Sequence, residues 1–185
     1  MDENLVRIRH ERSKKDFPFL KLEDDEFVEF AFKRARICFM IFFGGLVAGM
    51  VVILLMFLLI LLGSGAIDPM GRNFMYIMLT ALVVVAVITG MVGMMMFKGN
   101  RLFLTNKHAI QMIMDAPMAT SVNIIDLKSI EDASFSQKGI LQKYFNYGTL
   151  RLSTVGDETT YTFKYSDISP SELKAVSKLI SSAKK

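Results

Sequence analysis

Two long segments without a charged residue dominate this chain of 185 residues. The first covers residues 37–63 and the second covers residues 74–97. An α-helix needs about 20 consecutive apolar residues to cross the hydrocarbon core of a bilayer, and both segments exceed that length. The 36 residues before the first segment are rich in charge, which is not the pattern of a cleaved signal peptide. The sequence therefore predicts two transmembrane helices, the first long enough to tilt.

The flanks of these segments predict how they cross the membrane. Residues 64–73 form a short connection that is rich in turn-forming residues. Basic residues gather instead at the opposite ends of the two segments: Lys33, Arg34, Arg36, Lys98, Arg101 and Lys107. Lys and Arg are enriched on the cytoplasmic side of membrane proteins. We therefore expect a multi-pass protein of the inner or plasma membrane, with both termini cytoplasmic and residues 64–73 extracytoplasmic.

Small residues in both apolar segments indicate a place where the helices pack. Gly45 and Gly49 form a GxxxG pattern in the first segment, and Ala86, Gly90 and Gly93 fall at a similar depth in the second. Small residues let helix backbones approach each other in a membrane. We expect them to pack the hairpin against itself, with dimerisation through the same face as the alternative. Neither span holds an Asp, Glu, Lys, Arg or His residue, which favours an anchor over a transporter.

The residues after the second apolar segment read as a small α+β domain. They hold twelve basic and eight acidic residues, and so carry the whole net charge of +4. Residues 149–154 and 159–165 alternate apolar and polar side chains, as strands of an antiparallel sheet do. Shorter apolar runs predict further strands at 101–105, 108–114, 119–125 and 127–135. A capping box at 169–172 then opens an amphipathic helix that runs to about residue 182.

This order of strands followed by one helix predicts a bent antiparallel sheet or small barrel that the helix closes. The stretches NRLFLTNKHAI (100–110) and IIDLKSIEDASFSQKGILQKYFNYGTLRLST (124–154) resemble the bacterial pleckstrin-homology-like (PH-like) domain of the YdbS-like membrane proteins. The stretch EFVEFAFKRARICF (26–39) is similar to the polar entry before the first helix in that family. The resemblance implies a membrane α-helical hairpin joined to a PH-like domain that a C-terminal helix caps.

The expected domain organisation follows from this layout. An N-terminal cytoplasmic arm covers residues 1–36, and a PH-like domain covers residues 98–185. In the arm, Phe27, Phe30 and Ala31 fit a helical face, whereas Val28, Phe30 and Phe32 fit the two-residue period of a strand. Both interpretations stay open. Phosphoinositide-binding PH domains carry a basic cluster across their first two strands, but the turn here is only Thr-Asn-Lys (105–107), so that activity is not expected.

The loop at residues 138–148 has two interpretations. In the first, which the sequence favours, its aromatic residues pack and it merely connects two parts of the sheet. In the second it contacts a membrane or a partner, with Ile140, Leu141 and Tyr144 inserted and with Lys138 and Lys143 near anionic lipid headgroups. A basic residue near such a surface contributes on the order of 1 kcal/mol.

Catalysis finds little support in the sequence. Its two histidines, His10 and His108, have no neighbouring nucleophile or metal-ligand cluster, and there is no Gly-rich phosphate loop. The basic charge is too sparse for nucleic acid. We therefore expect no catalytic residue, metal or cofactor, and a membrane-anchored binding or scaffold module. The alternatives are a lipid- or envelope-stress-sensing protein and an accessory subunit of a membrane complex. Expected partners are the bilayer, its anionic headgroups, and a membrane protein or a second copy of the chain.

Overall fold

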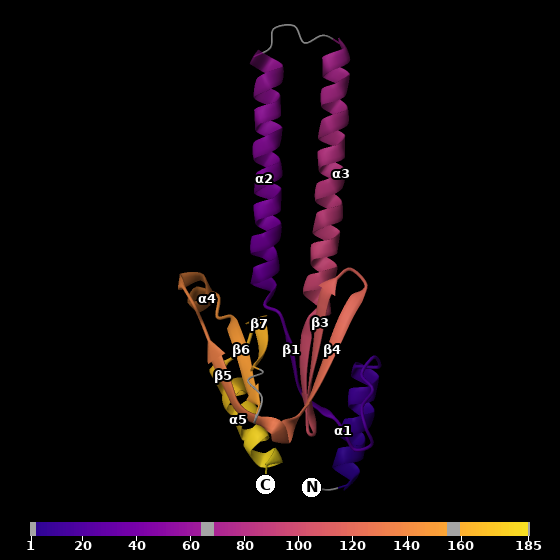
Figure 1. Ribbon diagram of the computed structural model, residues 1–185, viewed down its shortest axis with the longest axis vertical. Helices are drawn as coiled ribbons and strands as arrows, with labels where there is room; N and C mark the ends of the chain where they lie inside the picture. Colours follow the sequence, from indigo (N-terminus) through magenta and orange to yellow (C-terminus); the bar gives the residue numbers. More distant parts are fainter. Residues whose placement is uncertain (1–2, 64–68, 155–159, 185) are drawn as a thin grey trace. The chain divides into compact units, whose positions relative to one another are not determined.

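The computed structural model describes residues 3–63, 69–154 and 160–184 (Figure 1). The chain divides into two compact units. The helical unit consists of residues 36–97, and the domain unit combines residues 1–35 with residues 98–185. The sequence led us to expect residues 1–36 as an arm of their own. In the structure the N-terminal segment instead shares one unit with the C-terminal residues.

The helical unit contains two helices that are long and apolar enough to cross a membrane. They are α2 (Arg36–Gly63) and α3 (Pro69–Gly99), and α3 continues into the domain unit. In the most apolar 18-residue window of α2 no residue is buried within the protein. The core helix of a soluble protein is mostly covered by other residues, whereas this window of α2 is not.

Glycines of α3, not of α2, take part in the contact between the two helices. A Cβ atom at Gly90 would lie 3.4 Å from the ring of Phe43, and one at Gly93 would lie 3.0 Å from the ring of Phe42. At Gly45 and Gly49 a Cβ would meet nothing within 4 Å. The expectation that these two glycines touch the facing helix is therefore wrong: bulky Phe side chains of α2 fill the space that small residues of α3 leave. Ala86 is half-buried.

The domain unit contains two antiparallel sheets, with strand orders β1-β2-β3-β4 and β5-β6-β7. The first consists of β1 (Val28–Lys33), β2 (Arg101–Thr105), β3 (His108–Ala116) and β4 (Ala119–Asp126). The second consists of β5 (Ile130–Ser136), β6 (Gly148–Thr154) and β7 (Thr160–Ser166). A short 3-10 helix, η1 (Leu127–Ser129), joins them, where the sequence predicted the start of a strand. The helices are α1 (Glu3–Asp16), α4 (Ile140–Tyr144) and α5 (Pro170–Ala183).

Strand β1 settles the open question about the N-terminal segment. It pairs with β2, with Phe30 opposite Leu104 and Phe32 opposite Leu102. Phe32 is buried in the main core and Phe30 packs against that core, as the two-residue period of a strand predicts. Val28 lies beyond an irregularity in the pairing and packs against the other cluster, with Phe103 and Ile110. Since β1 precedes the apolar helices and β2 follows them, the helical hairpin is inserted between two neighbouring strands of one sheet.

The main core lies between the sheets and α5. Leu102, Leu104, Leu150 and Phe163 from the strands pack with Val176 and other apolar residues of α5. The helix begins with the expected capping box: the Ser169 hydroxyl accepts the Glu172 N–H, and the Glu172 side chain accepts the Ser169 N–H. These contacts give an α+β arrangement in which two bent antiparallel sheets, where the sequence predicted one bent sheet or small barrel, are closed by a C-terminal helix.

Candidate functional site

A buried carboxylate lies where the N-terminal segment meets the turn between β2 and β3. The Glu26 side chain is 2% exposed. Its Oε1 accepts a hydrogen bond from the Thr105 hydroxyl at 2.6 Å and lies 2.9 Å from His108 Nδ1. Its Oε2 accepts the backbone N–H of Glu23 at 2.9 Å. An ionised carboxylate only accepts, so His108 carries its proton on Nδ1.

These hydrogen bonds decide the charge state of Glu26. Burial raises the pKa of its carboxyl group, because a charge is poorly solvated inside the protein. Hydrogen bonds from Thr105, from the Glu23 backbone and from His108 favour the ionised form, and so does the charge of His108. Together they outweigh burial, and the pKa of Glu26 lies below its usual value.

Further polar contacts extend this cluster on both sides. Asn106 accepts the Phe27 N–H and donates to the Asp25 carbonyl, both at 3.0 Å. Lys107 Nζ donates to the Asp24 carbonyl at 3.0 Å. We call residues 23–27 and 105–108 together the clasp. Thr105 is fully buried, and its hydroxyl is engaged with Glu26 and with the backbone of the turn. The arrangement therefore holds the N-terminal segment to the sheet.

Metal ligation is a separate matter. Among the residues that the structure describes, no group of three or more His, Cys, Asp or Glu side chains could hold a metal ion. Within the described residues of the clasp, one contact joins two side chains of these types, and it is the contact of Glu26 with His108. The expectation of a protein without a cofactor stays a prediction.

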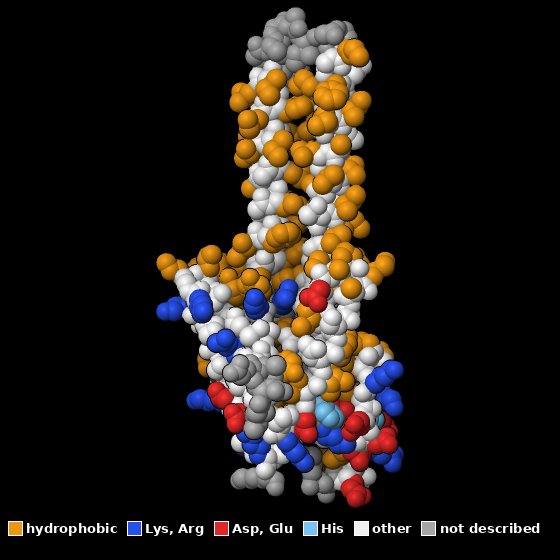
Figure 2. Space-filling model, in the orientation of Figure 1, with side chains coloured by type: hydrophobic (Ala, Val, Ile, Leu, Met, Phe, Trp, Pro, Cys, Tyr) orange, Lys and Arg blue, Asp and Glu red, His pale blue; other side chains and the backbone are white. Residues whose placement is uncertain are grey.

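The loop after β5 presents an exposed apolar surface. Ile140 is 86% exposed, Leu141 56% and Tyr144 80%, whereas Tyr147 is buried. The packing interpretation of this loop is therefore right for Tyr147 and wrong for Tyr144. Lys138 and Lys143 are exposed beside them. All five residues proposed for membrane or partner contact thus belong to one short segment, which we call the α4 segment (residues 138–145). Figure 2 shows hydrophobic and basic side chains gathered where Figure 1 places α4.

Local hydrogen bonds fix the shape of the α4 segment. The Gln142 side chain accepts the Lys138 N–H, and its backbone carbonyl accepts the Tyr147 N–H at 3.0 Å. Gly139 has φ 84°, a conformation that glycine adopts without strain. Gly148 is required for another reason, because a Cβ there would stand 2.6 Å from the Ser136 carbonyl oxygen. The segment is therefore held in place by its base while its apolar side chains stay uncovered.

The α4 segment lies near the point where the chain leaves the domain unit for α2. The Ala35 N–H donates to the Tyr165 carbonyl at 2.6 Å. The Tyr165 ring lies 6.4 Å from that of Tyr147, centre to centre, and Tyr147 closes the loop that carries α4. Figure 1 accordingly shows α4 at the end of the sheets where β1 ends. Exposed apolar residues and the chain's exit toward its apolar helix thus share one end of this unit.

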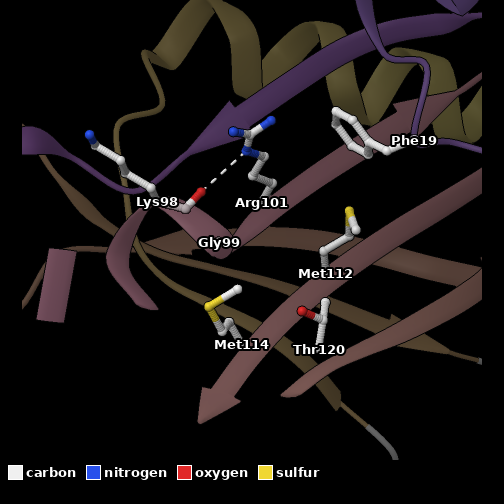
Figure 3. A pocket seen from close by; sticks show the side chains of 7 residues that line it. All are labelled: Phe19, Lys98, Gly99, Arg101, Met112, Met114 and Thr120. Carbon is white, nitrogen blue, oxygen red and sulfur yellow. Dashed lines mark hydrogen bonds between the residues drawn. The ribbon is translucent and has the colours of Figure 1, made fainter. Parts of the chain in front are cut away.

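A pocket of about 220 Å³ opens at the start of β2 (Figure 3). It is lined by Phe19, Lys98, Gly99, Arg101, Met112, Met114 and Thr120. Arg101 Nε donates to the Lys98 carbonyl at 3.2 Å, and the guanidinium lies 5.4 Å from the centre of the Phe19 ring. Sequence reasoning missed this pocket, because Phe19 comes from the N-terminal segment and the other residues follow the hairpin.

Comparisons with known proteins give little identification. No family model matches the chain, and no curated protein matches it. A solved structure that does match is a DUF1696 family protein with a pleckstrin-homology domain from Shewanella loihica PV-4. The match has 16% sequence identity, covers 46% of this chain and 71% of that chain, and has a TM-score of 0.34. A score of that size does not establish a shared fold, so the family resemblance stays a prediction.

Proposed function

We propose that this protein is a membrane-anchored, non-catalytic binding or scaffold module whose PH-like domain docks on the cytoplasmic membrane surface through the α4 segment. The observation that carries the proposal is the exposure of Ile140, Leu141 and Tyr144 next to two lysines. The PH-like assignment is supported by the two antiparallel sheets of four and three strands with a C-terminal helix. The cytoplasmic side follows from the distribution of basic residues along the sequence.

The chemistry of the α4 segment suits a bilayer surface. An apolar side chain of this size that leaves water contributes about 1.5–3 kcal/mol when fully buried. Each lysine near anionic lipid adds on the order of 1 kcal/mol. Because α2 and α3 tether the domain to the membrane, the contact is intramolecular and needs only modest strength to hold the domain in one orientation.

The test uses the full chain, because β1 belongs to the fold and residues 98–185 alone would lack it. We would replace Tyr144 by Cys in a Cys38→Ser background and attach an environment-sensitive fluorophore. In vesicles that contain phosphatidylglycerol the emission should shift to the blue. Added salt should reverse part of this shift, since the screening length falls to about 8 Å near physiological ionic strength.

Charge reversal separates the proposed contact from a general electrostatic effect. Lys138→Glu with Lys143→Glu should weaken the blue shift. The matched control, Lys174→Glu with Lys178→Glu, reverses two exposed charges on α5 and should leave it unchanged. If the emission wavelength does not change with lipid charge, with salt or with the two α4 substitutions, α4 does not contact the bilayer.

A second candidate function is that of an accessory subunit of a membrane complex. The observation that favours it is the open space beside Gly45 and Gly49 on α2, where a helix of another protein or of a second copy could approach closely. Purification in mild detergent distinguishes the two, since a stoichiometric protein partner would support the accessory role. Lipid recovered alone would support the lipid-contacting role, including its lipid- or envelope-stress-sensing form.

A further inference from the structure

We propose that the pocket at the start of β2 binds the headgroup of one anionic phospholipid. Its phosphate would lie against Arg101 and Lys98, and its glycerol and upper acyl carbons against Met112 and Met114. The inference rests on the membrane anchoring in the proposed function, but not on the α4 contact.

The cationic side of the pocket has unused hydrogen-bonding capacity. The Arg101 Nε–H donates to the Lys98 carbonyl. The two terminal nitrogens of Arg101 make no hydrogen bond to the residues that the structure describes. The Lys98 ammonium likewise has no partner among those residues, and no acidic side chain lines the pocket. A guanidinium presents paired donors that match phosphate oxygens. Its position near the Phe19 ring favours one orientation of the guanidinium plane.

The other wall is apolar and suits the part of a lipid next to the phosphate. Met112 and Met114 lie two residues apart on β3, so their side chains point to the same face of the sheet. Met112 pairs with Arg101 and Met114 with Thr120, which brings the cation and the methionines to neighbouring positions. Methionine adapts its shape to irregular apolar ligands. A free phosphate ester would use the cations but would leave this wall in water.

The chain places the pocket within reach of lipid headgroups. Lys98 directly follows Phe97, the last residue of the apolar segment, and Arg101 comes three residues later. Four residues span at most about 14 Å of extended chain. The interfacial layer on each side of the hydrocarbon core is roughly 5–8 Å thick. An Arg101 side chain can therefore meet a phosphate of the leaflet in which α3 ends.

Native mass spectrometry of the full chain, released from phosphatidylcholine bilayers with and without phosphatidylglycerol, tests the proposal. We expect one retained phosphatidylglycerol per chain. Arg101→Gln should lower that occupancy about tenfold or more, because it removes the charge and the paired donors that would hold the phosphate. Arg101→Lys should restore part of it. Thr120→Trp should also remove the lipid, because it fills the pocket and leaves both cations in place. The control Arg151→Gln removes an exposed arginine of β6 and should change nothing.

Two further arms identify the source of the phosphate and separate this site from α4. Glycerol 3-phosphate should not displace the lipid; displacement at similar concentration would assign the pocket to a free phosphate ester and overturn the proposal. Lys138→Glu with Lys143→Glu should leave occupancy unchanged even where it abolishes the α4 contact. Equal phosphatidylglycerol occupancy in the wild type, Arg101→Gln and Thr120→Trp proteins would overturn the pocket proposal and leave the α4 proposal standing.

Discussion

Two apolar surfaces outside the main core of the domain unit differ in how far the chain covers them. On the outer face of the first sheet, Phe103 and Ile110 are buried under Leu20 and its neighbours in the N-terminal segment, while Ile124 on β4, opposite Ile110, stays exposed. Around α4, Ile140 and Tyr144 have no such cover. An open apolar surface next to basic residues is what the contact proposed for α4 requires.

Removing the N-terminal segment, which covers Phe103 and Ile110 and supplies β1, should have the largest effect on the stability of the domain unit. Deletion of residues 1–33 takes away β1, its Phe32 in the main core, and the segment over Phe103. We expect the cooperative unfolding of the domain unit to be lost, as followed by circular dichroism on heating in detergent. Replacing residues 140–144 by a Gly-Ser linker should leave the transition in place. A deletion protein that still unfolds cooperatively would show that the N-terminal segment is dispensable for the fold.

The next comparison uses one substitution on each surface. Leu20→Ala should cost about 2–3 kcal/mol in the free energy of unfolding, because Leu20 is 7% exposed and packs in a cluster. Ile140→Ala should change it by no more than about 0.5 kcal/mol, as exposed positions usually do. Chemical denaturation in detergent measures both. Similar losses for the two variants would mean that α4 is covered within the protein after all.

Local patterns in the sequence predicted the parts of the fold whose partners are close in the chain. The alternation around Leu150 and Leu152 and the cap at Ser169 gave β6 and α5 nearly at their observed bounds. Strand β1 could not be decided, because its apolar residues fit two periods and its partner β2 lies beyond the whole hairpin. Only the pairing with β2 selects the strand.

The candidate site was predictable to a similar extent. The residues of the α4 segment could be named from their composition, but aromatic residues in a loop look the same whether they are buried or exposed. The contact of Glu26 with His108 joins residues 82 positions apart, and no local sequence pattern predicts it. The same holds for the pocket, where Phe19 and Arg101 meet only in the folded chain.

The helical unit offers the same contrast between covered and open positions. Gly93→Leu should loosen the hairpin by about 1–3 kcal/mol, because even a Cβ there stands 3.0 Å from the Phe42 ring. Gly49→Leu should have little effect on the hairpin itself, since a Cβ there meets open space. The distance between spin labels at the outer ends of α2 and α3 in bilayers would report the change. Equal changes for both variants would contradict the packing described above.

The smallest expected effect concerns the clasp, which holds the N-terminal segment to the sheet. The contribution of the clasp to the stability of the protein depends on pH. The pKa of Glu26 is lowered in the folded protein, so its carboxylate contributes stability that is fully present above its unfolded pKa, near the ordinary value of 4.5. That contribution is lost as the pH falls through the lower, folded pKa.

Glu26→Gln keeps the size of the side chain but removes the charge, and should cost on the order of 1–2 kcal/mol in the free energy of unfolding at neutral pH. The difference from wild type should shrink below about pH 4.5, as measured by denaturation at several pH values. Glu131→Gln, at an exposed carboxylate, is the control. A constant difference at every pH would mean that Glu26 acts through its shape alone, and the charge-assisted bond to His108 would not be what fastens the N-terminal segment to the sheet.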